Sequence, residues 1–257
     1  MAFLYFPFTA IYAILIASIE WEELSIDIFE ILGPVMVGPS SSHTAGAARI
    51  GSMARTLLGS TPVKAAIHLH GSFADTGLGH GTDRALVAGL LGMKPDDLRI
   101  PYAFEEAKKA GLSYTIDVVE LRDAHPNTAL IEVWGTEDKH LEMQASSLGG
   151  GRIMVDKLDG INVNFTGAYN TLVIRNLDYY SSEAAVTTIL SQFRINIANM
   201  SMWRHKRGGD ALMIIETDQH IKPEQVTFIG QLPGILSITY YDKEEDDDVS
   251  GFDEGNL

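Results

Sequence analysis

The sequence contains no cysteine among its 257 residues. This absence excludes disulfide bonds, a thiolate nucleophile and a thiolate metal site built from this chain alone. A reducing compartment suits such a chain, so we expect a cytoplasmic protein. Basic residues are also scarce, because 19 Lys and Arg stand against 34 Asp and Glu, for a net charge of −15. With no broad basic face to release counterions from phosphates, nucleic acid is not expected as a partner.

The two ends of the chain differ from its middle. Residues 1–25 form an atypical apolar extension whose first nineteen residues carry no charge. Pro7 interrupts this run, no Lys or Arg flanks it, and the basic start of a signal peptide is missing, so we expect neither a membrane span nor a signal peptide. Residues 243–257 are rich in acidic side chains that repel one another and bury little, which predicts a disordered acidic tail.

Periodicity predicts an α+β domain over residues 26–166. Helices are expected in AGAARIGSMARTLLG, ended by Gly59, in GTDRALVAGLLG, with Thr82 or Asp83 as N-cap, and in YAFEEAKKAG. The segment VKAAIHLHGSF between the first two predicts a strand entering a loop. Five further β segments follow between Tyr114 and Phe165, namely YTIDVVEL, TALIEVWG, HLEMQASSLG, RIMVDKL and INVNF.

Residues 168–242 predict a second unit. Strand patterns in TLVIRN, NIANMSMWR, ALMIIET and ILSITYYD alternate with helix patterns in SSEAAVTTILSQF and KPEQVTFIGQL. The resulting order βαββαβ within about 70 residues is the ferredoxin-like split arrangement.

The stretch GPVMVGPSSSHTAGAARIG combines hydroxyls, one imidazole and small residues before a predicted helix. A helix N-terminus presents unpaired N–H groups and a partial positive charge, so added hydroxyls make a site for a carboxylate or phosphate. The ending of a P-loop is absent. The alternative is an elaborate helix cap, which explains one serine and leaves the imidazole unexplained. The candidate residues are Ser40, Ser41, Ser42, His43 and Thr44.

Two other segments carry histidines. In HLHGSFADTGLGHGTD, His68 and His70 share one face of a strand, with His80 and Asp83 further on. This pattern is either half of a metal site or packing plus one functional histidine. In DAHPNTALIEVWG, Pro126 holds His125 extended at a loop-to-strand junction, where the imidazole either points into a cleft or belongs to a surface loop.

The segments GPVMVGPSSSHTAGAARIG, HGSFADTGLGHGTD, HPNT and SLGGGRI resemble the motifs of iron–sulfur-dependent L-serine dehydratases. In order and spacing the chain is similar, from about Phe29 to Asp242, to the β subunit of the two-subunit enzyme. The resemblance implies an N-terminal catalytic-interface domain followed by a C-terminal ACT domain. One departure concerns the first turn of that ACT unit, where Ser181 stands in place of the expected glycine. Binding of an effector and a purely dimerising role both remain open for it.

The resemblance also implies an activity and its parts. The family deaminates L-serine to pyruvate and ammonia with a [4Fe–4S] cluster, which cysteines of a partner α chain would hold. His43, His70 and His125 are candidates for the base that takes the Cα proton, because imidazole titrates near neutral pH. The expected substrate-binding residues are Ser40, Ser41, Ser42, Thr44, Ser72, Asn127 and Thr128.

Two hypotheses from other functional classes compete with that of a dehydratase subunit. One is a hydrolase that binds a divalent metal through His68, His70, His80 and Asp83. The other is a non-catalytic amino-acid sensor built on the ACT unit. Self-association through the ACT unit is expected in either the enzyme or the sensor.

Overall fold

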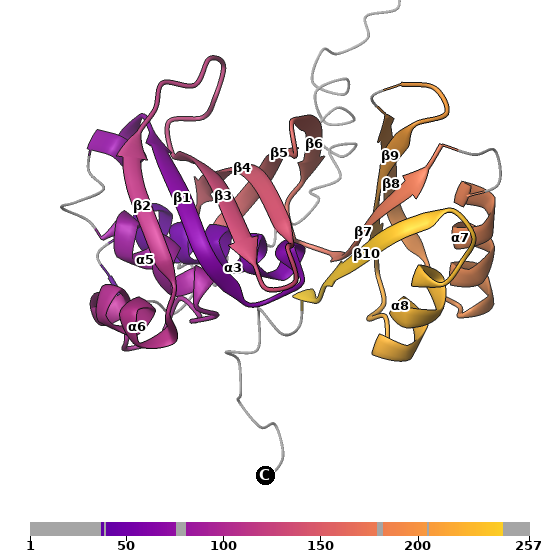
Figure 1. The fold of residues 1–257 in the computed structure, drawn as a ribbon, viewed down its shortest axis with the longest axis horizontal. Helices are drawn as coiled ribbons and strands as arrows, with labels where there is room; N and C mark the ends of the chain where they lie inside the picture. The colour runs from indigo at the N-terminus through magenta and orange to yellow at the C-terminus, as the bar shows by residue number, and fades with distance from the viewer. Residues whose placement is uncertain (1–36, 39, 76–80, 179–181, 205, 244–257) are drawn as a thin grey trace, which may run out of the picture. The chain divides into compact units, whose positions relative to one another are not determined.

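The computed structural model describes residues 37–38, 40–75, 81–178, 182–204 and 206–243 (Figure 1). The chain divides into two compact units, Met1–Leu32 and Gly33–Leu257, and the first lies wholly outside the described residues. The apolar extension 1–25 and the acidic tail beyond Lys243 therefore stay sequence predictions, as do the domain boundaries. Among the described residues, no helix is long and apolar enough to cross a membrane.

The first sheet has six strands in the order β2-β1-β3-β4-β5-β6, visible from left to right in Figure 1. β1 and β2 are parallel, and all other neighbours are antiparallel. The parallel pair requires a crossover, which is supplied by the helices between β1 and β2. The strands are β1 (Pro62–His70), β2 (Ser113–Val118), β3 (Thr128–Gly135), β4 (His140–Gly149), β5 (Arg152–Leu158) and β6 (Ile161–Phe165).

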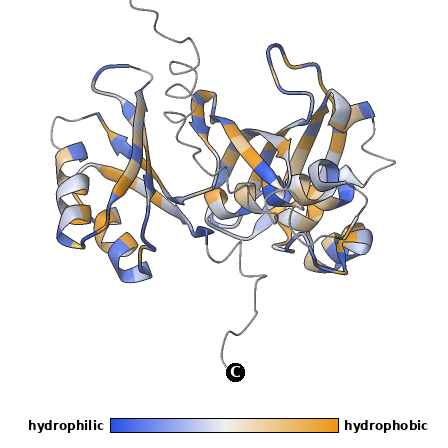
Figure 2. Ribbon diagram, turned by 180° about the vertical axis from the view of Figure 1, so that it is seen from behind, coloured by the Kyte–Doolittle hydropathy of each residue, from blue (hydrophilic) through white to orange (hydrophobic). Residues whose placement is uncertain are grey.

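Helices cover one face of this sheet. They are η1 (Ser41–Gly46), α3 (Ala47–Leu58), α5 (Thr82–Leu90), η2 (Ile100–Tyr102) and α6 (Ala103–Ala110). Along β1, Ala65, Ile67 and Leu69 are buried in the same core as α3 and α5, while His68 and His70 alternate with them and point to the other face. The alternation gives the strands their hydrophobic and hydrophilic bands in Figure 2. The α+β prediction is thereby confirmed.

The second sheet has four strands in the order β10-β7-β9-β8, all antiparallel. Its elements are β7 (Asn170–Leu177), α7 (Ser182–Gln192), β8 (Ile197–Arg204), β9 (Asp210–Thr217), α8 (Pro223–Gly230) and β10 (Ile235–Tyr241). The element order βαββαβ is the one that the sequence predicts. Leu172, Ile174, Met213 and Ile215 form a core with Val186 and Leu190 of α7.

Three local predictions need correction. The first helix starts at Ser41 with a π-helical turn, so Ser41 and Ser42 belong to the helix, with Ser40 as its N-cap, and not to a preceding loop. The first strand ends at His70, and residues 72–75 are helical. Neither Thr82 nor Asp83 caps α5: Gly81 occupies the N-cap position, with no side-chain cap. Gly81 has a left-handed φ of +78°, which glycine adopts without strain.

Asp178 joins the end of β7 to the hairpin between β8 and β9. Its Oδ2 accepts hydrogen bonds from the Gly208 N–H at 2.8 Å and from the Arg204 guanidinium at 2.9 Å. The Gly208 N–H, followed by Arg204, lowers the pKa of Asp178 from its usual 3.8. A carboxyl with a lowered folded-state pKa stabilises the fold above its unfolded-state pKa, and that contribution is lost as the pH falls through the folded-state value.

Asp178→Asn should therefore lower the melting temperature slightly at pH 7 and flatten its decline below about pH 4. Melting curves recorded by circular dichroism from pH 7 down to about 3 measure both effects. Asp210→Asn, an exposed position on the neighbouring strand, serves as control and should keep the wild-type slope. An unchanged acid limb in Asp178→Asn would contradict the expected role of this carboxylate.

Candidate functional site

The serine-rich segment begins its helix with an ordered cap. Ser40 has an extended backbone and its Oγ accepts a hydrogen bond from the His43 N–H at 3.2 Å. η1 then continues directly into α3. Such π-helical turns are frequent at functional sites. Capping accounts for the position of Ser40, and a contact of Ser40 with substrate stays a prediction.

His43 connects this helix start to the turn after β1. Its Nδ1 lies 3.1 Å from Ser40 Oγ, and its Nε2 lies 3.2 Å from Ser72 Oγ. The turn can approach because of Gly71, which has φ +56°, and a Cβ there would lie 2.6 Å from the carbonyl oxygen of Pro126. Only glycine tolerates both the conformation and the contact. The structure thus brings Ser72 to the serine-rich segment, and its contact with substrate stays a prediction.

The turn between β4 and β5 lies against the same helix start. Ser41 Oγ accepts a hydrogen bond from the Gly150 N–H at 3.3 Å, so the Ser41 hydroxyl hydrogen can still be donated to a ligand. A Cβ on Gly149 would lie 3.5 Å from Ser42 Oγ, which places Ser42 at this turn too. Arg49 donates to the Gly151 carbonyl oxygen at 3.3 Å. Arg49 is therefore anchored at the same turn, and the sequence reasoning did not name it.

The segment before β3 completes the site. The Phe73 N–H lies 3.4 Å from the Pro126 carbonyl oxygen, and the Ser147 N–H donates to the Asn127 carbonyl oxygen at 2.9 Å. Thr128 stands opposite His70 in the β1–β3 register, so these two side chains share a face of the sheet. Four segments far apart in the sequence therefore meet at one end of the first sheet. We call this region the candidate site.

A chain of hydroxyls fixes the His125 segment. Thr128 Oγ1 donates to the His125 carbonyl oxygen at 2.6 Å and lies 2.8 Å from Ser146 Oγ. Ser146 Oγ in turn donates to Asp156 at 2.6 Å. Ser146 and Asp156 were missed by the sequence reasoning, because only the pairing of β3, β4 and β5 reveals that they follow Thr128. Of these side chains, Thr128 holds the backbone of the predicted residue His125 directly.

Several buried polar atoms at the candidate site have no hydrogen-bond partner among the described residues. They are Thr44 Oγ1, Asn127 Oδ1 and Ser147 Oγ, and the residues Thr44 and Ser147 are only 2% and 0% exposed. Buried polar atoms are normally hydrogen-bonded, because leaving them unpaired costs free energy. The position of these three unpaired atoms favours a polar ligand at the candidate site. Two of them belong to predicted substrate-binding residues, and Ser147 is an addition.

The residues that suggested a metal site in the sequence, His68 and Asp83 among them, make other contacts in the structure. His68 Nδ1 lies 2.5 Å from an Asp117 carboxylate oxygen on the neighbouring strand, and the Asp83 carboxylate accepts the Arg84 N–H. In the described part of the chain, no three His, Asp or Glu side chains are placed to hold a metal ion. His80 lies outside the described residues.

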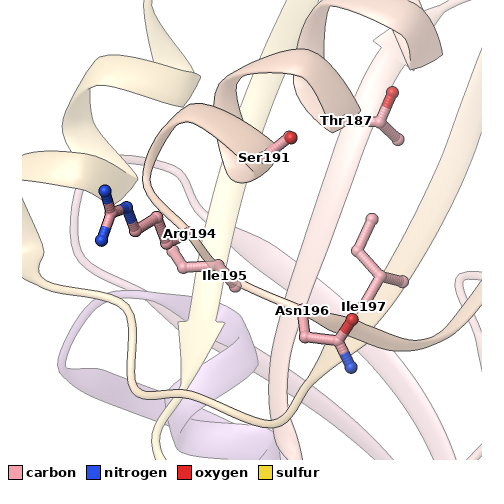
Figure 3. A pocket seen from close by; sticks show the side chains of 6 residues that line it. All are labelled: Thr187, Ser191, Arg194, Ile195, Asn196 and Ile197. Atoms are coloured by element: carbon pink, nitrogen blue, oxygen red, sulfur yellow. The ribbon is translucent and has the colours of Figure 1, made fainter.

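A shallow cavity of about 450 Å³ lies elsewhere, at the end of α7 and the start of β8 (Figure 3). It contains no histidine or carboxylate and so offers no acid or base. Its lining residues are Thr187, Ser191, Arg194, Ile195, Asn196 and Ile197. The cavity is therefore no candidate for the catalytic centre.

The fold is α+β, and hydroxyls and histidines from four segments gather at one end of its first sheet. Residues 25–123 match the family model described as serine dehydratase beta chain. The chain is 40% identical over 212 residues to a probable L-serine dehydratase β chain of Bacillus subtilis, covering 82% of this chain and 96% of that protein. It belongs to the family of L-serine dehydratase β chains.

Two further relatives extend this comparison. The chain is 38% identical over 192 residues to the L-serine dehydratase β chain of Peptoniphilus asaccharolyticus, covering 74% of this chain and 86% of that protein. It is 25% identical over 197 residues to a D-3-phosphoglycerate dehydrogenase of Bacillus subtilis, covering 76% of this chain and 37% of that protein. Related sequence thus also occurs as part of a larger protein with a different named activity.

Proposed function

We propose that this chain is the β subunit of an L-serine ammonia-lyase that converts L-serine to pyruvate and ammonia together with an α chain. The observation that carries the proposal is the arrangement of His43 between Ser40 and Ser72, beside the hydroxyls of Ser41 and Ser42. The names of the two β-chain relatives support the substrate and the presence of a second subunit.

The iron–sulfur cluster does not fit the residues of this chain. Thiolates hold such clusters, and the sequence has no cysteine. The described residues also offer no group of three His, Asp or Glu that could replace thiolates. We therefore assign the [4Fe–4S] cluster to the α chain and confine the roles below to residues of this chain.

Binding of the substrate carboxylate is assigned to the helix start. Hydroxyl hydrogens of Ser41 and Ser42, the positive end of the helix and the nearby Arg49 all favour an anion. Stabilising the negative charge of the substrate carboxylate matters, because an unstabilised carboxylate opposes removal of the neighbouring Cα proton. The buried hydroxyl of Thr44 and the amide oxygen of Asn127 would orient the ammonium and hydroxyl groups.

The reaction is a β-elimination that balances without an oxidant. A base removes the Cα proton, the Cα–H electron pair forms the Cα=Cβ bond, and the β-hydroxyl leaves as water after taking a proton. The resulting aminoacrylate tautomerises to an imine, which water hydrolyses to pyruvate and ammonia. A histidine of the candidate site would supply the base.

Residues 168–242 are proposed to form an ACT domain that mediates self-association. The order of the elements and the strand order β10-β7-β9-β8 support this assignment. Whether this unit also binds an amino acid is tested by the calorimetric titration of the isolated chain described below.

The chain purified alone should be colourless and inactive on L-serine, because it has no thiolate to hold a cluster. Addition of its cysteine-bearing α chain under anaerobic conditions should restore formation of pyruvate, measured with lactate dehydrogenase. The α chain alone is the matched control. Pyruvate formation by the β chain without any cluster-bearing partner would overturn the proposal.

A second candidate is a non-catalytic amino-acid sensor, because related sequence also occurs in a protein with another named activity, a D-3-phosphoglycerate dehydrogenase. Calorimetric titration of the isolated chain with L-serine separates the two: binding combined with no turnover in the presence of the α chain would favour the sensor.

A further inference from the structure

A β-bulge interrupts β5 at Asp156. On the side of β4, the consecutive residues Gln144 and Ala145 pair with Lys157 and Val155, so Asp156 between them has no partner. The pairing of β5 with β6 also skips Asp156. Bulges of this kind re-aim a side chain and are frequent next to active sites. The direction of the Asp156 side chain is therefore set by the bulge and not by regular alternation along β5.

Packing explains part of this bulge. Ile153, Val155 and Leu158 are buried in the core of the first sheet, so the buried positions are two apart before the bulge and three apart across it. Regular alternation would bury Lys157 instead of Leu158. The inserted residue therefore keeps Lys157 exposed, but this reason does not require a carboxylate at position 156.

The carboxylate of Asp156 has a specific contact of its own. Its Oδ2 accepts the Ser146 hydroxyl at 2.6 Å. No ion pair within the described ranges includes Asp156, so this carboxylate is not half of a salt bridge. Hydrogen bonds to an ionised acceptor are stronger than those between neutral groups. The contact therefore fixes the side chain of Ser146.

Ser146 connects this contact to the turn before β3. Its Oγ lies 2.8 Å from Thr128 Oγ1, which donates to the His125 carbonyl oxygen at 2.6 Å. Ser146 and Thr128 are only 2% and 0% exposed, so neither hydroxyl can exchange its protein partner for water without cost. Displacement of Ser146 would therefore reach the turn through Thr128.

Asn127 lies inside that turn. Its N–H donates to His125 Nδ1 at 3.1 Å, and its carbonyl oxygen accepts the Ser147 N–H at 2.9 Å. Its side-chain oxygen Oδ1 is buried and has no hydrogen-bond partner among the described residues. The backbone of Asn127 is thus held on both sides, while its amide oxygen is left for a ligand.

We infer that Asp156 is a positioning residue of the candidate site, acting through Ser146 and Thr128. It holds the turn of residues 125–128, so that Asn127 Oδ1 keeps its place for a polar ligand. The identity of that ligand as L-serine rests on the proposed function, whereas the effect of Asp156 on the turn does not.

The first test needs no activity and uses the full-length chain without the α chain. Hydrogen–deuterium exchange, measured by mass spectrometry on peptides that cover residues 125–128, reports the opening of the turn. Asp156→Ala should exchange faster there, whereas Asp156→Asn should match the wild type, because the asparagine oxygen can still accept from Ser146. Peptides of α3 and of the second sheet should be unchanged in both variants.

Glu132→Ala is the matched control for this measurement, because it removes a carboxylate from the face of β3 that also carries Thr128. It should leave the exchange of the turn at the wild-type rate. Wild-type exchange of the turn in Asp156→Ala would overturn the inference. Equal acceleration over the whole chain would overturn it too, because it would show a general loss of stability.

The second test measures steady-state kinetics of the reconstituted enzyme. Asp156→Ala should lower kcat/KM for L-serine by about 10-fold, the scale of one misplaced hydrogen bond. Asp156→Asn should stay within about threefold of the wild type, a rescue that identifies the acceptor oxygen as the group that matters. An equal loss in the two variants would overturn the role of that oxygen.

A double-mutant cycle tests the route through Thr128. Thr128→Val removes the hydroxyl and keeps the shape, so Asp156→Ala added to it should cause no further loss of kcat/KM. Additive losses would overturn the route, because they would show that Asp156 acts independently of Thr128. Inactivity of the wild-type complex would overturn the proposed function, while the exchange experiment would still decide the effect of Asp156 on the turn.

Discussion

Replacing Ser41 and Ser42 together with alanine is expected to lower kcat/KM for L-serine by about 100-fold or more. Each hydroxyl donated to a charged carboxylate contributes about 1.5–3 kcal/mol, and tenfold in rate corresponds to about 1.4 kcal/mol. Ser41 Oγ accepts the Gly150 N–H, so its hydroxyl hydrogen can still be donated to the carboxylate. Steady-state kinetics of the reconstituted enzyme measure the loss.

The interpretation of this double variant depends on its stability. Neither serine is the N-cap, since that role belongs to Ser40, so the melting temperature should change little. Ser191→Ala, an exposed serine on α7, is the matched control and should be normal in both measurements. Normal kcat/KM with a clearly lower melting temperature would instead identify the serines as an elaborate cap.

Gly51→Ala is expected to destabilise the protein by about 3 kcal/mol or more. A Cβ at this position would lie 2.2 Å from the Leu86 carbonyl oxygen and 3.0 Å from the Gly89 Cα. From the opposite side, a Cβ on Gly89 would lie 2.1 Å from the Ala48 carbonyl oxygen. These contacts involve backbone atoms, so α3 and α5 would have to separate.

Thermal unfolding followed by circular dichroism tests this expectation, since 3 kcal/mol corresponds to a fall of at least about 6 °C for a chain of this size. Alanine is otherwise the better helix former by about 1 kcal/mol, so the net loss is a lower bound on the cost of crowding. Ser52→Ala at the next position adds no atoms and should stay within about 0.5 kcal/mol. A melting temperature of Gly51→Ala equal to that of Ser52→Ala would mean that the two helices do not cross at this point.

Local sequence patterns determined most of the elements of this protein. β3 and β4 span Thr128–Gly135 and His140–Gly149, the ranges that alternation and turn residues predict. Gly59 ends α3 as expected, with a left-handed φ of 65°. Such features depend on neighbours within a few residues, where side-chain period and backbone preference act directly. The lack of cysteine likewise decided from composition alone that this chain holds no thiolate-bound cluster.

The candidate site was predicted as a set of residues, and only the tertiary structure decided how they work together. The sequence left His43, His70 and His125 equivalent, because the contacts of an imidazole depend on which groups face its nitrogens. Those groups are Ser72, Leu121 and Asn127, and the first two lie 29 and 51 positions from their histidines. Likewise, Ser146 and Asp156 reach His125 only through strand pairing. Contacts of this kind arise from the packing of distant segments, which no local pattern encodes.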